Sequence, residues 1–201
     1  MEIFATFETW HLGDGNYPPL KKGQLVNLSF EIEPDVLTAA QKDAPQRFHH
    51  LGQAEYEFTG VVLCVYRDDS SDRIVVIEAD QFRFYINSPL TEGVGHGDTV
   101  SGRGTLALDH YIWVEFLADY SDPPDLFYKL RVMDICRVQI PERFIVRSGR
   151  NVSLPTRVKL YDYGPGDLTN VESITDEEYV SFIVQFADAD VPLEPIPRTF
   201  L

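Results

Sequence analysis

The chain has 201 residues, of which 44% are hydrophobic and 24% charged, and its formal net charge is −15 at pH 7. A chain of this length can bury a core without disulfide staples. The acidic balance argues against a general nucleic-acid binder and against adhesion to an anionic membrane, because both depend on lysine and arginine. No stretch approaches the ~20 apolar residues that a membrane helix needs. The first residues lack the pattern of a secretory signal, so we expect a cytoplasmic protein with no membrane association.

Period-two alternation of apolar and polar residues is the dominant pattern, beginning at 2–10. Residues 24–33 alternate cleanly, which predicts an antiparallel strand with one wet face. After Pro34, residues 35–43 predict a short helix that ends before the next proline. Residues 56–66 are apolar on both faces and predict a central, covered strand.

The second half of the chain predicts further strands and an ambiguous segment. Strands are expected at 72–80, 81–87, 111–118, 126–140, 143–147 and 156–161. Residues 175–187 begin like a helix, because Thr175 and Glu178 have capping-box spacing. Their alternating β-branched and aromatic residues favour a strand slightly more. The three prolines near the C-terminus predict an extended tail.

Residues 93–113 hold five glycines and raise the question of a phosphate-binding loop. Gly97 and Gly102 have P-loop spacing, but Arg103 and Gly104 stand where that motif needs Lys and Ser or Thr. A dinucleotide fingerprint would have to open a helix, whereas the alternation here continues as a strand. Paired glycines on the inner face of a strand permit the sharp coiling that closes small barrels. We therefore expect a barrel wall, with a turn at Asp109.

These elements predict a mostly β fold: antiparallel strands in an OB-like barrel or a sandwich, with one or two short helices. The resemblance to the OB barrel is one of architecture and says little about function. We expect one β domain over 1–187, with a core barrel at about 20–140 and a C-terminal elaboration at about 141–187. A Pro-rich extended tail is expected over 188–201.

Motifs for catalysis are absent from the sequence. There is no nucleophile elbow and no H-E-x-x-H pair. Cys64 and Cys136 lie in apolar runs, so we expect reduced, inert thiols. We therefore expect no enzyme, no catalytic residues and no cofactor. The alternative is a metal-dependent hydrolase, with His96 and Asp98 from the glycine corner and His110 from the hairpin as metal ligands.

Basic residues are concentrated between 126 and 160, a segment that contains eight of them and only two acidic residues. Internal compensation by acidic turns is one explanation. The other is a strip that binds anions or an oligonucleotide, with Arg131, Arg143 and Arg147 as its contacts and nearby aromatic residues stacking on bases. The acidic remainder of the chain disfavours nucleic acid.

Asp134 interrupts the alternation of its predicted strand, because it falls on the face of Leu130 and Val132. A β-bulge would flip the register there. Without one, the carboxylate would be buried and would need partners. The bulge is the favoured alternative.

The function that the sequence favours is a non-catalytic protein-binding module, either an acidic adaptor or an immunity-type inhibitor that masks a basic partner. Strong acidity speeds encounter with a basic protein. The expected contact rim consists of acidic turn residues: Asp68, Asp69, Asp72, Asp119, Asp122 and Asp125. The alternatives are the oligonucleotide-binding barrel and the metal-dependent hydrolase described above.

Overall fold

The computed structural model describes residues 2–9, 12, 19–67, 73–109, 124–138, 146–148, 151–153, 168–174 and 181–188. Its first strands are β1 (Glu2–Glu8), β2 (Leu25–Leu28), β3 (Phe30–Ala39), β4 (Arg47–Gly52), β5 (Glu55–Arg67), β6 (Arg73–Ala79) and β7 (Phe82–Asn87). A 3-10 turn, η1 (Pro89–Thr91), follows. The remaining strands are β8 (Thr99–Leu108), β9 (Tyr128–Val138), β10 (Val146–Ser148), β11 (Asn151–Ser153), β12 (Leu168–Asn170) and β13 (Ser181–Asp188). The prediction of a mostly β fold is confirmed.

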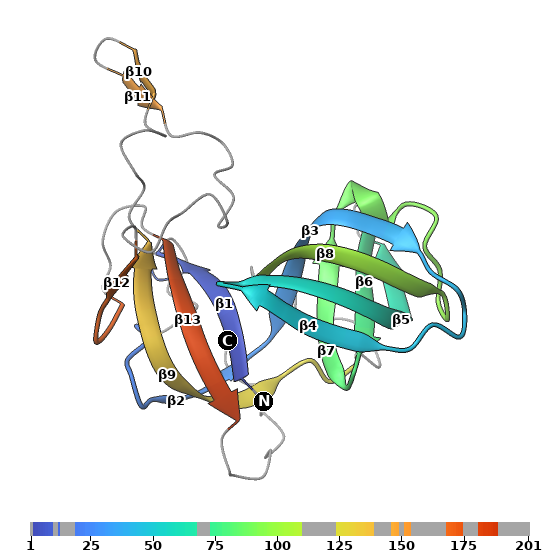
Figure 1. Cartoon of the computed structure of the whole chain (residues 1–201), viewed down its shortest axis with the longest axis horizontal. Helices are drawn as coiled ribbons and strands as arrows, with labels where there is room; N and C mark the ends of the chain where they lie inside the picture. The colour runs from blue at the N-terminus through green and yellow to red at the C-terminus, as the bar shows by residue number, and fades with distance from the viewer. Residues whose placement is uncertain are drawn as a thin grey trace.

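Five strands close into a barrel. β3 pairs antiparallel with β8, β8 with β5, β5 with β6, and β6 with β7. A parallel contact between Glu31 of β3 and Tyr85 of β7 completes the ring. β4 adds to the barrel by pairing with β5 (Figure 1).

The extra strands form a second curved sheet beside the barrel (Figure 1). β1 pairs antiparallel with β13, β13 with β9, and β9 with both β2 and β12. β1 also meets β8 of the barrel in parallel, at Thr6 and Ala107. Only Ser29 separates β2 from β3, so the second sheet is joined to the barrel along both of its sides. β10 and β11 make a separate two-stranded ladder.

The inner-face glycines of β8 do what the sequence predicted. A Cβ atom at Gly102 would lie 2.5 Å from Cζ of Phe58, and one at Gly104 would lie 2.2 Å from the carbonyl oxygen of Glu33. The neighbouring strands therefore approach β8 more closely than any side chain would permit. This close approach is what a tightly coiled barrel wall requires.

The helix expected at 35–43 is wrong. β3 continues to Ala39 and pairs with β8 throughout, with a register shift between Pro34 and Val36. β7 pairs with β3 only at Glu31, so Pro34 lies where one edge of β3 has no partner among the described strands, a position that tolerates proline. Pairing with β8 supplies the backbone hydrogen bonds and overrides a weak helical preference.

Other expected elements have mixed outcomes. The ambiguous C-terminal segment is a strand over Ser181–Asp188. The strands expected at 111–118 and 156–161, and the tail from 189 onward, lie outside the described residues. The sequence did not predict β4, β11 or β12. Cys64 and Cys136 are free thiols, each half-buried.

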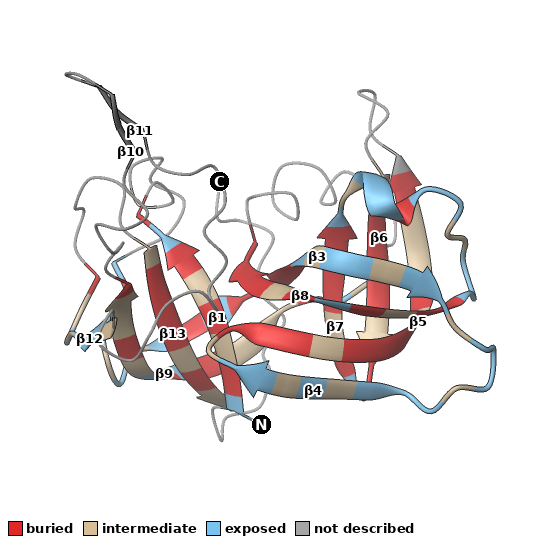
Figure 2. Cartoon of the chain, turned by 45° about the horizontal axis from the view of Figure 1, so that its top comes forward, coloured by how far each residue is buried: buried red, intermediate tan, exposed pale blue. Residues whose placement is uncertain are grey.

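One apolar core runs through both sheets. Figure 2 shows buried residues along β1, β5, β8 and β13, whereas β4 and the second half of β3 are largely exposed. The largest fully buried side chains are mainly aromatic and come from both sheets: Phe7, Phe30, Tyr56, Phe58, Phe82, Phe84, Tyr85 and Phe186. In the part of the chain that the structure describes, no helix is long and apolar enough to cross a bilayer.

Candidate functional site

The segment that precedes β9 lies against the outer surface of the barrel. Leu126 is fully buried there, in a cluster with Tyr66, Ile74, Val76 and Tyr85. Alternation along β6 and β7 turns these side chains away from the barrel core, so without a cover they would be exposed to water. Burial of Leu126 therefore fixes the path of its neighbour Asp125, the one expected contact-rim residue that the structure describes.

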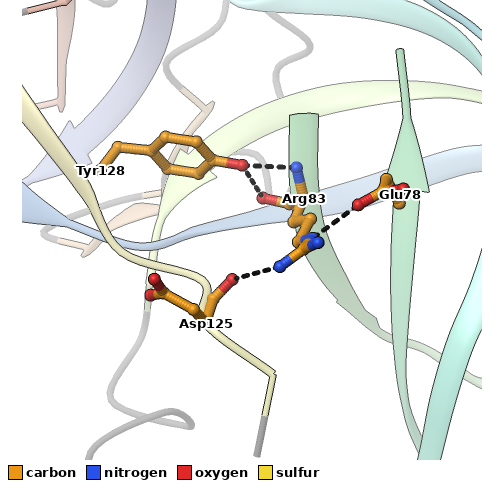
Figure 3. Close-up of polar contacts among 4 residues, drawn as sticks. All are labelled: Glu78, Arg83, Asp125 and Tyr128. Carbon is orange, nitrogen blue, oxygen red and sulfur yellow. Dashed lines mark hydrogen bonds and ion pairs between the residues drawn. The ribbon is translucent and has the colours of Figure 1, made fainter. Parts of the chain in front are cut away.

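Arg83 joins this segment to the barrel (Figure 3). Its Nε donates a hydrogen bond to Oε2 of Glu78 at 2.6 Å, and its Nη1 donates to the carbonyl oxygen of Asp125 at 3.5 Å. The hydrogen bond to Glu78 is the main cause that raises the pKa of the guanidinium above its usual value. Arg83 thus holds β6, β7 and the segment before β9 in one arrangement.

Tyr128 completes the junction from the second sheet. Its hydroxyl accepts a hydrogen bond from the backbone N–H of Arg83 at 2.5 Å and donates to the carbonyl oxygen of Arg83 at 3.3 Å. Its ring stacks on Phe82, with ring centroids 4.9 Å apart. Burial raises the pKa of Tyr128 from 10.0 to about 12, so the hydroxyl keeps its proton, and its ability to donate, to a higher pH than an exposed tyrosine.

Two exposed carboxylates stand at this end of the barrel. Asp125 Oδ1 accepts a hydrogen bond from the N–H of Phe127 at 3.1 Å, which forms an Asx turn. Asp80 occupies the tight turn between β6 and β7, where it and Gln81 have positive φ angles of 49° and 68°. We call Glu78, Asp80 and Asp125 the acidic hairpin end. Arg83 pairs with Glu78, while Asp80 and Asp125 are exposed, so the site can present negative charge from a fixed backbone.

The rest of the expected contact rim cannot be placed at this end. Asp68, Asp69, Asp72, Asp119 and Asp122 lie outside the described residues. Asp80 and Glu78 were not singled out from the sequence. The signal that could have found them is the two-residue turn between two alternating strands.

Two residues of the expected metal site, His96 and Asp98, make hydrogen bonds to nearby backbone groups. Nδ1 of His96 lies 2.6 Å from the carbonyl oxygen of Leu63, and Oδ2 of Asp98 accepts from the N–H of Gly95 at 2.7 Å. His110 lies outside the described residues. Among the residues that the structure describes, no three His, Cys, Asp or Glu side chains gather in a way that could hold a metal ion.

The expected anion-binding residues are not brought together by any described contact. Arg131 is exposed on β9 and donates from Nη1 to the carbonyl oxygen of Gly23 at 3.1 Å. Arg143 lies outside the described residues, and Arg147 belongs to β10, of which only the backbone is described. The ring of Tyr128 packs on Phe82 and Phe30 and is not presented to a base.

The interruption at Asp134 is a β-bulge, as the sequence favoured. On β13, Gln185 pairs with Asp134 but the next residue, Phe186, pairs with Val132, so Met133 is the extra residue of β9. The Asp134 side chain is 34% exposed, and its Oδ1 lies 2.8 Å from Nζ of Lys22. The hydrogen bond from Lys22 is the main cause that lowers the pKa of Asp134.

Asp109 is a buried polar residue, whereas the sequence predicted only a turn at this position. Asp109 is fully buried and accepts hydrogen bonds from Oγ of Ser29 at 3.1 Å and from the Tyr85 hydroxyl. Burial, followed by the negative charge of Asp109, raises the pKa of Tyr85 well above its usual value. These bonds lock the place where β3, β7 and β8 meet. Nothing local in the sequence marks the burial, because the partners lie far away along the chain.

Comparison with family models, with curated proteins and with solved structures finds no match to the chain.

Proposed function

We propose that the protein is a non-catalytic protein-binding module whose acidic hairpin end docks on a basic protein partner. It would act as an adaptor or as an immunity-type inhibitor that masks basic groups. The observation that carries this proposal is the fixed presentation of Asp125 and Asp80. Both are exposed, while Leu126 is fully buried and Arg83 bonds to Glu78 and to the Asp125 carbonyl. A preformed contact surface loses little freedom on binding.

The net charge of the chain supports the same partner. A formal charge of −15 attracts a basic protein over a distance and repels nucleic acid and anionic lipid. Charges at the rim of an interface mainly raise the association rate. The acidic hairpin end therefore needs to contribute only modestly to final affinity in order to select the partner.

The oligonucleotide-binding barrel is the second candidate. We infer OB character from the strand pairing: a β5–β6–β7 meander closed by a parallel pair is the order of an OB barrel whose last strand comes first in the chain. OB barrels bind ligands on the outer face of their second and third strands. Here these strands are β6 and β7, and that face is packed under Leu126. The covered face and the acidic charge both count against this candidate.

A pull-down at low salt, from a lysate of cells that express the protein, tests the proposal. The bait is the full chain as wild type, as Asp80→Lys/Asp125→Lys, or as Asp43→Lys/Glu92→Lys. The last variant changes the charge by the same amount, at exposed residues that do not belong to the acidic hairpin end. Each lysate is divided, and half is treated with nuclease.

We expect one stoichiometric basic protein that survives nuclease, is lost from the first variant and is kept by the second. Material that nuclease removes would favour the oligonucleotide-binding alternative. Equal capture by both variants would remove the acidic hairpin end from the contact surface.

A further inference from the structure

We propose a second docking surface on the outer face of β2 and β9. It would bind an acidic segment, whereas the acidic hairpin end would bind a basic one. The second surface consists of Leu25, Arg131 and Met133, with Lys22 and Lys129 at its edges, and we call it the bulge patch. Its occupant is an acidic segment of another protein that carries an apolar side chain. This inference rests on different residues from the proposed function and stands without it.

The β-bulge creates the apolar centre of the patch. Met133 is the extra residue, and its side chain is 47% exposed. Leu25 is directly opposite Arg131 in the β2–β9 ladder and is 43% exposed. Hydrogen bonds from Gly23 N–H to Val132 O at 2.8 Å and from Val132 N–H to Gln24 O at 2.9 Å hold the two segments together. Two of the five exposed large hydrophobic residues in the described part of the chain therefore lie on one small surface.

Cations surround this centre in a chain whose net charge is strongly negative. Arg131 is held by its bond to the Gly23 carbonyl, which positions the guanidinium beside Leu25. Lys22 is bonded to Asp134 at 2.8 Å and lies 3.6 Å from Glu172, so its one positive charge is opposed by two carboxylates. Lys129 pairs with Asn27 two residues along the same ladder. Counted with Asp134 and Glu172, the three cations leave one net positive charge, which favours an acidic segment over a basic one.

The apolar centre favours a protein segment over nucleic acid. Binding of single strands relies on aromatic side chains that stack on bases. The aromatic residue that begins β9, Tyr128, packs inward on Phe82. The patch instead offers methionine, leucine and arginine. Methionine adapts to irregular apolar surfaces, and both methionine and arginine are enriched where proteins meet.

The sequence provides a reporter for the test, because Met1 and Met133 are its only methionines. Protein labelled with ¹³C at the methionine methyl groups gives two methyl signals, and Met133→Leu assigns the one from the patch. The probes are a peptide of four Glu-Glu-Leu repeats, an all-glutamate peptide of the same length, and oligothymidylate. The variants are Arg131→Glu and, as a control with the same charge change at another exposed site, Lys42→Glu.

We expect the Glu-Glu-Leu peptide to shift the Met133 signal in a saturable way, and the all-glutamate peptide to bind more weakly. Arg131→Glu should weaken peptide binding about tenfold, while Lys42→Glu stays within about twofold of wild type. The proposal fails if neither peptide shifts Met133, if Arg131→Glu binds like wild type, or if oligothymidylate binds more tightly than the peptides. The last result would make the patch a nucleic-acid site.

Discussion

The Tyr128 hydroxyl of the second sheet lies 2.5 Å from the backbone nitrogen of Arg83 in the barrel, and it also donates to the Arg83 carbonyl. One side chain therefore bonds both backbone groups of a residue, as a neighbouring strand would. Tyr56 connects the same two parts from the barrel side. Its hydroxyl accepts a hydrogen bond from the N–H of Phe4 in β1 at 2.8 Å. Two tyrosines thus join the barrel and the second sheet at backbone positions.

Removal of the Tyr128 hydroxyl should destabilise the fold. Tyr128→Phe leaves both backbone groups of Arg83 without this partner, so we expect a loss of about 1–3 kcal/mol in the free energy of unfolding. Urea unfolding at neutral pH measures it. Tyr128→Leu should lose more, because the stacking on Phe82 is lost as well. A wild-type midpoint for Tyr128→Phe would show that the hydroxyl does not join the two sheets.

The same tyrosines predict a loss of stability at high pH. The pKa of each is raised from 10.0 to about 12, chiefly by burial. The folded chain therefore keeps protons that the unfolded chain loses, and this stabilisation is complete below pH 10 and disappears as the pH approaches 12. The free energy of unfolding should fall more steeply over this range in wild type than in Tyr56→Phe/Tyr128→Phe. Equal slopes in the two proteins would contradict the assignment.

The barrel wall predicts contrasting effects of alanine at two glycines. At Gly104 the new Cβ meets the Glu33 carbonyl oxygen at 2.2 Å, and we expect a cost of about 1–3 kcal/mol or failure to fold. At Gly95 the nearest atom is 3.4 Å away, so Gly95→Ala should change stability by less than about 0.5 kcal/mol. Thermal unfolding of the two variants makes the comparison. Similar midpoints would show that the strands do not approach β8 so closely.

The ion pair at the bulge predicts part of the acid sensitivity. The pKa of Asp134 is lowered by Lys22, so its stabilisation is present above the usual carboxyl value of 3.8 and is lost as the pH falls toward the lowered value. Asp134→Asn should therefore lose less stability than wild type below about pH 4. Lys22→Met should flatten the same part of the curve, and the two changes should not be additive. Additive effects would mean that the two groups act separately.

Sequence patterns predicted the strands that have a clear inside and outside. Alternation identified β2 and the inner face of β8, because each covers a core with one face. β6 and β7 were expected from their apolar and aromatic residues, and they are buried on both faces over most of their length. The second half of β3 has only exposed and half-buried residues and carries a proline, so it lacked that signal. β4 was missed because its pattern is short and mostly exposed.

The candidate site was predicted only in part, because residues that bond to one another in it lie far apart along the chain. The sequence singled out Asp125 and the bulge at Asp134, because each has a local signal. Arg83 and Tyr128 are 45 residues apart, and Asp109 and Ser29 are 80 apart. Such pairs are set by the closure of the two sheets, which no local pattern encodes.

The central claim is that exposed carboxylates at the acidic hairpin end attract a basic partner. The most direct test is the association rate of the captured partner, measured by stopped flow over a range of salt concentrations. Wild type and Asp43→Lys/Glu92→Lys should associate rapidly, with a steep fall as salt is added. Asp80→Lys/Asp125→Lys should associate about tenfold more slowly at low salt, with a shallower dependence. Equal rates and equal salt dependence in all three proteins would contradict the claim.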